Sequence, residues 1–390
     1  MRLKTILFCS VASVLIATGA NAADSVITPE PEAVDYVRVC DAYGTGYFYI
    51  PGTETCLRIH GHVRYEATAG DDVYSRGFES RDDKLFENLN TKRDSWDKLA
   101  RFALRLSTAT ETEYGALTSF TEMRFQWKNG NDDSSTGTLR KAYMQLGGLR
   151  VGLDDSAFKT FAGDLGDVIN DDVILSGGYR TGLISYTFAA HNGFSAILSL
   201  EQGNNDDVDS VPSTWAGAPW SGTINDYTPH VVGGLKYAQG WGALTAVAAY
   251  DASNQSWAAK LRGEVIITDR LSLWTMGGYK SNKDNYVNVL DANSQVTGQV
   301  RAISSFYGTW GGDWAVWGGA AYQLTDKAVA NAQLAYDGSK TFAATANVEY
   351  ALVPGFVITP EVSYTQWNDS KSVLNGKDAV QGMIRFERSF

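Results

Sequence analysis

Hydrophobic and polar residues alternate along many short stretches of this chain. In CLRIHGHVRYE, residues 56–66, charged and imidazole side chains occupy one parity, whereas Leu57, Ile59, Val63 and Tyr65 occupy the other. A repeat of two residues is typical of a β-strand with one polar and one apolar face. Further stretches with this repeat lie at 98–108, 116–127, 257–268 and 341–352. Helical periodicity is weak nearly throughout, so the pattern predicts an all-β protein.

The connections between the predicted strands alternate between long and short. Our interpretation gives sixteen strands, and the long connections fall at about 67–97, 128–137, 155–179, 202–226, 281–312 and 368–377. Two connections expected to be long, near Ser253 and Gly338, are short. Long loops at one end and short turns at the other are typical of an outer-membrane barrel, whereas a soluble sandwich lacks this asymmetry. We therefore predict a 16-stranded antiparallel transmembrane β-barrel over 56–390, with apolar faces toward lipid and polar faces toward a water-filled lumen.

The first 22 residues have the pattern of an export signal. MRLKTILFCSVASVLIATGANA contains two basic residues, an apolar run and a small-x-small ending, which predicts a signal peptide over 1–22 and cleavage before Ala23. A lipoprotein signal at Cys9 is disfavoured because bulky Phe8 precedes it. Beyond this segment no apolar run is long enough for a membrane helix. We expect 23–55 to form a periplasmic segment that leads into the first strand of a barrel in the outer membrane of a Gram-negative bacterium.

Charge and cysteine content restrict the function further. The chain has 33 basic and 44 acidic residues, and loss of Arg2 and Lys4 with the signal leaves a net charge near −13. This balance argues against nucleic acid as a partner. Cys40 and Cys56 are the cysteines that survive cleavage, and an exported chain with an even count is expected to pair them. Metal binding or redox chemistry is the alternative, but the chain has no CxxC motif.

The end of the chain fits the barrel. In GMIRFERSF, Phe390 shares its parity with Phe386 and Ile384, and Arg385 and Glu387 take the other parity. A final strand that ends in an aromatic residue is the signal that barrel-insertion machinery recognises, so we assign this role to Phe390. Arg388 occupies a position where a second aromatic residue is usual, so the match is incomplete.

Arginines gather on the predicted lumen face of the first strands. The residues with this parity are Arg58, Arg64, Arg101, Arg105, Arg124 and Arg150. Guanidinium groups stay charged and can stack side by side, so they are suited to a polar pore wall. The alternative is that these arginines simply pair with nearby carboxylates such as Glu66 and Glu122.

Several other patterns admit a second interpretation. His60 and His62 have a spacing that can hold zinc, but no third ligand is identifiable and polar wall residues are the better interpretation. The acidic stretch GDLGDVINDD could supply calcium ligands, but it lacks the spacing of a calcium loop, and a solvated loop face is another interpretation. No catalytic motif or cofactor site is recognisable, although an outer-membrane enzyme stays an alternative. The Trp-rich stretch FYGTWGGDWAVWGG could belong to a secreted adhesin or carbohydrate-binding protein, or to the aromatic girdle of a barrel.

Several segments resemble a known family. PEPEAVDYVRVCDAYGTGYFYIPGTETCLRIHGHVRYE strongly resembles the start of mature porins from the Brucella and rhizobial branch of the alphaproteobacteria. The resemblance continues through FKTFAGDLGDVINDDVILSGGYRTGLISYTF, HVVGGLKYAQGWG, GGDWAVWGGA, LVPGFVITPEVSYT and RFERSF, and so covers nearly the whole mature chain.

The resemblance implies a homotrimer of 16-stranded barrels, each with its own pore for passive diffusion of small hydrophilic solutes and ions. The implied surroundings are outer-membrane lipid and lipopolysaccharide. The resemblance also implies that the third long loop, about 155–178, folds inward and narrows the channel. Its carboxylates, which we assign to the constriction, are Asp155, Asp164, Asp167, Asp171 and Asp172.

Overall fold

A computed structural model describes residues 38–74, 96–128, 131–132, 137–204, 221–290, 293, 295–302 and 304–390. The chain divides into two units, Met1–Val37 and Arg38–Phe390, and the fold described below is that of the second unit. The predicted signal peptide, and the part of the predicted 23–55 segment that precedes Arg38, lie outside the described residues.

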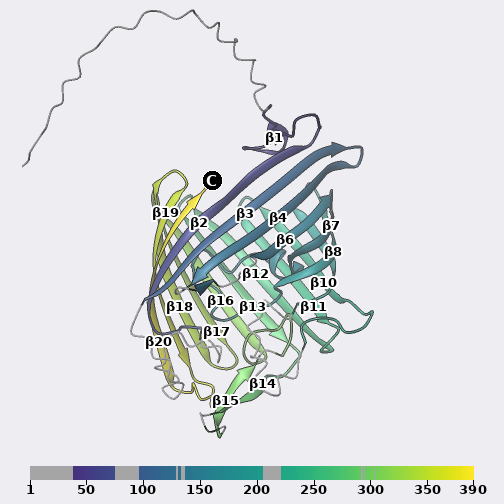
Figure 1. Ribbon diagram of the computed structural model, residues 1–390. Helices are drawn as coiled ribbons and strands as arrows, with labels where there is room; N and C mark the ends of the chain where they lie inside the picture. Colours follow the sequence, from purple (N-terminus) through teal and green to yellow (C-terminus); the bar gives the residue numbers. More distant parts are fainter. Residues whose placement is uncertain are drawn as a thin grey trace, which may run out of the picture. The chain divides into compact units, whose positions relative to one another are not determined.

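The second unit is a closed barrel of sixteen long antiparallel strands (Figure 1). The strands are β2 (Cys56–Gly70), β3 (Asp97–Thr112), β4 (Gly115–Lys128), β6 (Thr138–Leu146), β7 (Leu149–Asp155), β8 (Arg180–Ala189), β9 (Phe194–Glu201), β10 (His230–Gln239), β11 (Gly242–Asp251), β12 (Ser256–Thr268), β13 (Leu271–Lys280), β16 (Trp314–Thr325), β17 (Ala328–Asp337), β18 (Thr341–Val353), β19 (Phe356–Trp367) and β20 (Lys377–Ser389). Each strand pairs with its neighbours in chain order, and β2 pairs with β20 to close the sheet. The predicted fold class is therefore confirmed.

The two faces of the strands have the predicted orientation. Ile59, Phe102 and Leu261 belong to the apolar parity and are 50%, 37% and 55% exposed on the outside of the barrel. On the opposite parity, polar and charged side chains such as Lys260 and Gln333 are buried inside. Because the side chains of a strand alternate between its two faces, a barrel in lipid keeps its apolar parity outside and its polar parity toward the lumen.

Six smaller elements of the described residues precede the barrel strands or lie in the connections between them. They are η1 (Asp41–Tyr43), β1 (Phe48–Tyr49), β5 (Asn131–Asp132), α1 (Ala157–Thr160), β14 (Asn285–Leu290) and β15 (Val296–Ala302). β14 and β15 form a separate hairpin within the connection predicted at 281–312, at the end of the barrel that carries the long loops (Figure 1). Within the described part of the chain, no helix is long and apolar enough to cross a membrane.

A disulfide joins the segment before the barrel to the first residue of β2. Cys40 and Cys56 are bonded, with their Cα atoms 6.1 Å apart, which confirms the predicted pairing. Beside the disulfide, Tyr49 of β1 pairs with Cys56 in the sheet. At the other end of the chain, the Phe390 and Gly61 backbones exchange two hydrogen bonds, of 3.0 and 3.1 Å, next to the β2–β20 seam.

Candidate functional site: the pore wall and loop 3

The connection between β7 and β8, residues 156–179, runs along the inner face of the barrel, and we call it loop 3. Side chains of lumen parity donate hydrogen bonds to its backbone carbonyls. Asn347 of β18 binds the Asp167 carbonyl at 2.9 Å, and Trp317 of β16 binds the Ile174 carbonyl at 2.9 Å. Loop 3 is therefore attached to the wall through its backbone.

Two carboxylates of the wall bind backbone N–H groups of loop 3. Glu201 of β9 accepts from the Ala157 N–H at 2.9 Å and from the Ser156 hydroxyl at 2.6 Å. Glu361 of β19 accepts from the N–H groups of Ile169 and Asn170. Charged acceptors make hydrogen bonds roughly twice as strong as neutral ones, so these contacts fix the loop at two separate places.

The start of loop 3 forms a single helical turn, α1. Ser156 caps this turn, because its hydroxyl oxygen accepts from the Phe158 N–H at 3.1 Å while the hydroxyl itself donates to Glu201. Serine is a preferred N-cap residue for this reason. The sequence therefore begins the loop with a rigid turn rather than with irregular backbone.

The predicted carboxylates differ in their surroundings. Asp164 and Asp167 are exposed, and the Asp164 side chain retains 81% of its accessible surface, with the Lys159 ammonium 4.0 Å away. Asp171 and Asp172 are half-buried. Desolvation by burial, together with the charge of Asp172, raises the pKa of Asp171 to about 8. At neutral pH Asp171 is therefore mostly protonated and adds little negative charge to the loop.

Asp155 belongs to the wall rather than to the loop. It is the last residue of β7, and its carboxylate lies 3.1 Å from the Lys141 ammonium of β6. The neighbouring carboxylate of Asp154 contacts Lys141 at 2.9 Å and Arg150 at 2.6 Å. Asp155, which we predicted as part of the constriction loop, therefore lies on β7, one residue before loop 3 begins.

Most of the predicted wall arginines come together on β2, β3 and β4. In register, Arg64 lies opposite Arg101, and Arg105 lies opposite both His60 and Glu122. Arg150, on β7, lies further along the wall and stacks 4.3 Å over the Tyr143 ring. The structure thus groups five of the six predicted arginines on three neighbouring strands, and we call this group the arginine wall. Its members are Arg58, Arg64, Arg101, Arg105 and Arg124.

Carboxylates are interleaved among these arginines. Glu122 accepts from Arg105 at 2.7 Å and from Arg124 at 2.6 Å. Across the β2–β20 seam, Arg64 pairs with Glu387 at 2.8 Å, and Arg385 pairs with Glu66 at 2.7 Å. Pairing with lumen carboxylates, the alternative noted above, therefore applies to Arg64, Arg105 and Arg124.

The pairing leaves the arginine wall with excess positive charge. Within the described part of the chain, Arg101 contacts an amide oxygen, that of Gln126, rather than a carboxylate. Among the described residues of β2–β4 and β20 with lumen parity, six arginines stand against five carboxylates, which are Glu66, Asp97, Glu111, Glu122 and Glu387. Arg385 is not one of the predicted wall arginines, although its parity in GMIRFERSF indicates the lumen face.

The two histidines belong to this wall. The His60 ring contacts the Ser107 hydroxyl at 3.2 Å, and His62 is buried beside the β2–β20 seam. No group of three metal-binding side chains occurs among the described residues.

Some residues that hold the site were not singled out from the sequence. Glu201 and Glu361 are the clearest examples, and the available signal was their lumen parity on strands that border long connections. That signal marks a polar inward side chain, but it does not indicate which loop the side chain binds.

A closed barrel with an apolar outer band, a charged inner wall and a loop fixed inside defines an outer-membrane channel protein. Comparison with known proteins agrees, because the sequence model of the porin subfamily matches residues 24–385. The chain is 52% identical over 400 residues to Porin Omp2b of Brucella suis biovar 1 and to Porin Omp2b of Brucella abortus strain 2308, with full coverage of each chain. The chain belongs to the porin family, and it is an outer-membrane porin that forms a channel.

Solved structures show the same fold at low sequence identity. The outer-membrane channel DcaP of Acinetobacter baumannii matches with a TM-score of 0.59 at 16% identity, over 88% of this chain and 99% of that one. The anion-selective porin of Comamonas acidovorans matches with a TM-score of 0.52 at 11% identity, over 86% and 100%. The class and the fold agree with the resemblance noted in the sequence, and neither comparison favours a carbohydrate-binding protein.

Proposed function

We propose that loop 3 and the arginine wall of β2–β4 form the constriction of a passive channel for small hydrophilic solutes and ions, and that three barrels assemble as a homotrimer. The observation that carries the proposal is the attachment of loop 3. Its backbone is bound to side chains of β9, β12, β16, β18 and β19, whereas the exposed carboxylates of Asp164 and Asp167 take no part in this attachment.

Separation of charge gives this arrangement a mechanism. Carboxylates on loop 3 and guanidinium groups on the uncovered part of the wall produce a field across the water between them. Such a field orients dipolar solutes and water, and it screens permeants by size and charge without binding them tightly. Passive permeation through such a field needs no chemical step, and we infer that the protein is a channel without enzymatic activity.

Net charge supports a weak preference for cations. The mature chain carries an excess of acidic residues, which favours cations. Charges at the narrowest section act on a permeating ion at shorter distance, so they affect selectivity more than the net charge of the whole chain does. The interleaved carboxylates of the arginine wall also reduce the positive potential there. The partners we infer are lipopolysaccharide and lipid around the apolar band, and the barrel-insertion machinery that recognises the end of β20.

Planar lipid bilayers provide the experiment. Purified trimer is expected to insert with stepwise conductance that tolerates voltage, and liposomes containing it are expected to swell in small sugars but not in large oligosaccharides. A folded trimer without any conductance would contradict the proposed function. A conductance without a size limit would contradict the constriction alone.

A further inference from the structure

Several charged side chains of the described residues are buried around the rim of the barrel that carries the long loops, and five of them contact segments inside the barrel. These five come from five different strands and are at most 3% exposed: Glu201 of β9, Asp251 of β11, Lys260 of β12, Lys280 of β13 and Asp337 of β17. Burial of a charge costs several kcal/mol unless hydrogen bonds compensate it. The contacts of these five residues therefore indicate what the rim holds.

Two of these residues hold the ends of loop 3. Glu201 binds the N–H of Ala157 at the start of the loop. Lys260 donates to the Ser176 carbonyl at 3.0 Å, near the end of the loop, and its ammonium lies 4.2 Å from the centre of the Phe158 ring. Hydrogen bonds to the backbone of loop 3 thus compensate the cost of burying both Glu201 and Lys260.

The other three hold a second inward segment. We call residues 304–312, which precede β16, the wedge segment. Asp251 accepts from the Phe306 N–H at 3.0 Å, Lys280 donates to the Trp310 carbonyl at 2.7 Å, and Asp337 accepts from the Gly311 N–H at 3.0 Å. The wall therefore fixes the wedge segment through its backbone, as it fixes loop 3.

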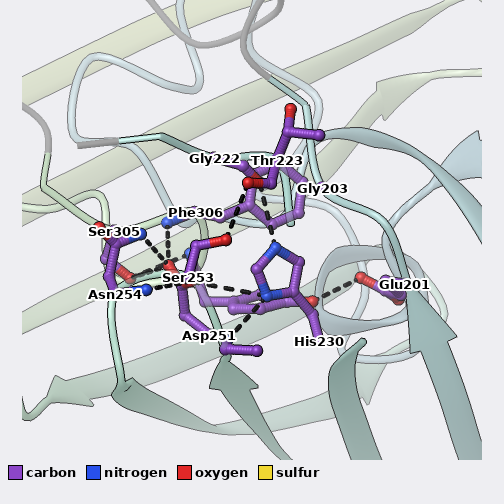
Figure 2. Close-up of polar contacts among 12 residues, drawn as sticks. Glu201, Gly203, Gly222, Thr223, His230, Asp251, Ser253, Asn254, Ser305 and Phe306 are labelled. Carbon is purple, nitrogen blue, oxygen red and sulfur yellow. Dashed lines mark hydrogen bonds and ion pairs between the residues drawn. The ribbon is translucent and has the colours of Figure 1, made fainter. Parts of the chain in front are cut away.

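The wedge segment fills the space between the wall and the two ends of loop 3. Phe306, Tyr307 and Trp310 are completely buried. The Phe306 ring stacks on His230 of β10, with centroids 5.9 Å apart and planes at 9° (Figure 2). On the loop side, the Tyr307 ring packs at 5.3 Å against Phe158, and the Gly178 N–H donates to the Phe306 carbonyl at 3.1 Å.

His230 supports the wedge segment by ring stacking, and both nitrogens of its ring are hydrogen-bonded. Its Nδ1 accepts from the Ala252 N–H at 2.9 Å, so the proton resides on Nε2, which donates to the Gly222 carbonyl at 3.1 Å. Figure 2 shows this ring beside Asp251, whose second carboxylate oxygen accepts from Asn254 and from Phe306. Each polar group around the ring thus has a defined partner.

Glu201 connects the two inward segments. Besides the groups of loop 3, it accepts from the Tyr307 hydroxyl at 2.8 Å. The contact between the segments has no spare room, because a Cβ atom added at Gly177 would lie 1.7 Å from the Tyr307 carbonyl oxygen. Loop 3 therefore cannot approach the wall here while the wedge segment is in place.

From this geometry we propose that the wedge segment sets how far loop 3 projects into the lumen, and therefore the size limit of the pore, although its buried side chains touch no solute. Tyr307, Phe306 and Glu201 act as positioning residues. The inference rests on the proposed function, because it takes loop 3 to be the constriction. It goes further by assigning control of the pore size to a different connection of the barrel.

Two variants and one control test this role in the purified trimer. Tyr307→Phe removes only the hydroxyl that binds Glu201, and Phe306→Ala with Tyr307→Ala empties the wedge. The matched control is Tyr286→Phe. This change removes a hydroxyl of strand β14 that donates to the Asp369 carboxylate at 2.7 Å. The measurements are single-channel conductance, open-channel current noise and liposome swelling in sugars of increasing size.

We expect Tyr307→Phe to increase the current noise, because the end of loop 3 loses one restraint. We expect the double variant to raise the conductance by about 1.3-fold or more and to admit larger sugars, because loop 3 settles toward the wall where packed side chains are missing. Tyr286→Phe is expected to match the wild type in all three measurements. Unchanged noise in Tyr307→Phe, together with unchanged conductance and sugar limit in the double variant, would overturn the proposal.

Two further outcomes are decisive. If the double variant does not assemble, Tyr307→Phe decides alone, and wild-type noise would overturn the proposal. Asp164→Asn with Asp167→Asn, measured in parallel, separates the wedge from the constriction. A shift in ion selectivity there, with no effect of the wedge variants, would reject the wedge only, whereas unchanged selectivity would reject the constriction and the wedge together.

Discussion

Removal of the exposed carboxylates of loop 3 changes the charge of the proposed constriction with little effect on packing. In Asp164→Asn with Asp167→Asn, the backbone carbonyls that Arg262 and Asn347 bind are retained, so loop 3 keeps its attachment. The matched control is Asp326→Asn, which removes an exposed carboxylate from the short turn between β16 and β17. We expect the double variant to move selectivity toward anions and the control to have no effect.

Coulomb's law gives the magnitude. Because Asp164 is 81% exposed, the dielectric constant of water applies. An ion that passes about 8 Å from one carboxylate gains about 0.5 kcal/mol, which screening over one Debye length at 0.15 M salt reduces to about 0.2 kcal/mol. Since a cation loses this energy and an anion recovers it, two carboxylates alter the permeability ratio roughly 3- to 4-fold. At 1 M salt the Debye length is about 3 Å and the change falls below about 1.5-fold.

The assay is the zero-current potential in a salt gradient across a planar bilayer, repeated at low and high mean ionic strength. The predicted result is a shift toward anions that largely disappears at high salt. An unchanged potential at low salt would refute the reasoning, because it would place both carboxylates away from the path of the ions. A shift of equal size in Asp326→Asn would refute it in another way, since the effect would then follow total charge.

Two further predictions concern pH and the disulfide. The pKa of Asp171 is raised to about 8, so this group is mostly protonated below that pH and gains its charge above it. Cation preference is therefore expected to increase between pH 7 and 9 in the wild type but not in Asp171→Asn. The same increase in the variant would contradict the assignment. Cys40→Ser with Cys56→Ser opens a loop with a sequence separation of 16 and is expected to lower the free energy of unfolding by about 3 kcal/mol, with conductance unchanged. The measurement is a urea titration in which the folded barrel is followed on unheated gels. An unaltered free energy of unfolding would contradict this account of the disulfide.

The faces of the barrel could be predicted because a strand has a period of two. Once Ile59, Phe102 and Leu261 are assigned to lipid, the parity of Arg64, Arg101 and Lys260 follows without any knowledge of distant contacts. The disulfide could be predicted for a similar reason, since only two cysteines remain in the exported chain. Both inferences depend on local sequence or on simple counting.

The contacts that hold loop 3 depend on the closed barrel instead. Glu361 and the Asn170 N–H that it binds are 191 residues apart in sequence, and Glu201 and Tyr307 are 106 apart. Lumen parity identifies these carboxylates as inward, but only the curvature of the sheet brings them to a particular loop. The same limit explains why the connection before β16 gave no sign of the β14–β15 hairpin or of the wedge segment.

The central claim is that loop 3 borders the conducting path at its narrowest section. The most direct test places a cysteine at Asp167 and follows a single trimer while a small charged thiol reagent is added. Cys40 and Cys56 are already bonded to each other and so do not react, and Leu261→Cys on the lipid face is the matched control. The account predicts that Asp167→Cys loses conductance in three steps, one for each pore, while the control does not change. Full conductance after complete labelling at Asp167, confirmed by mass spectrometry, would contradict it.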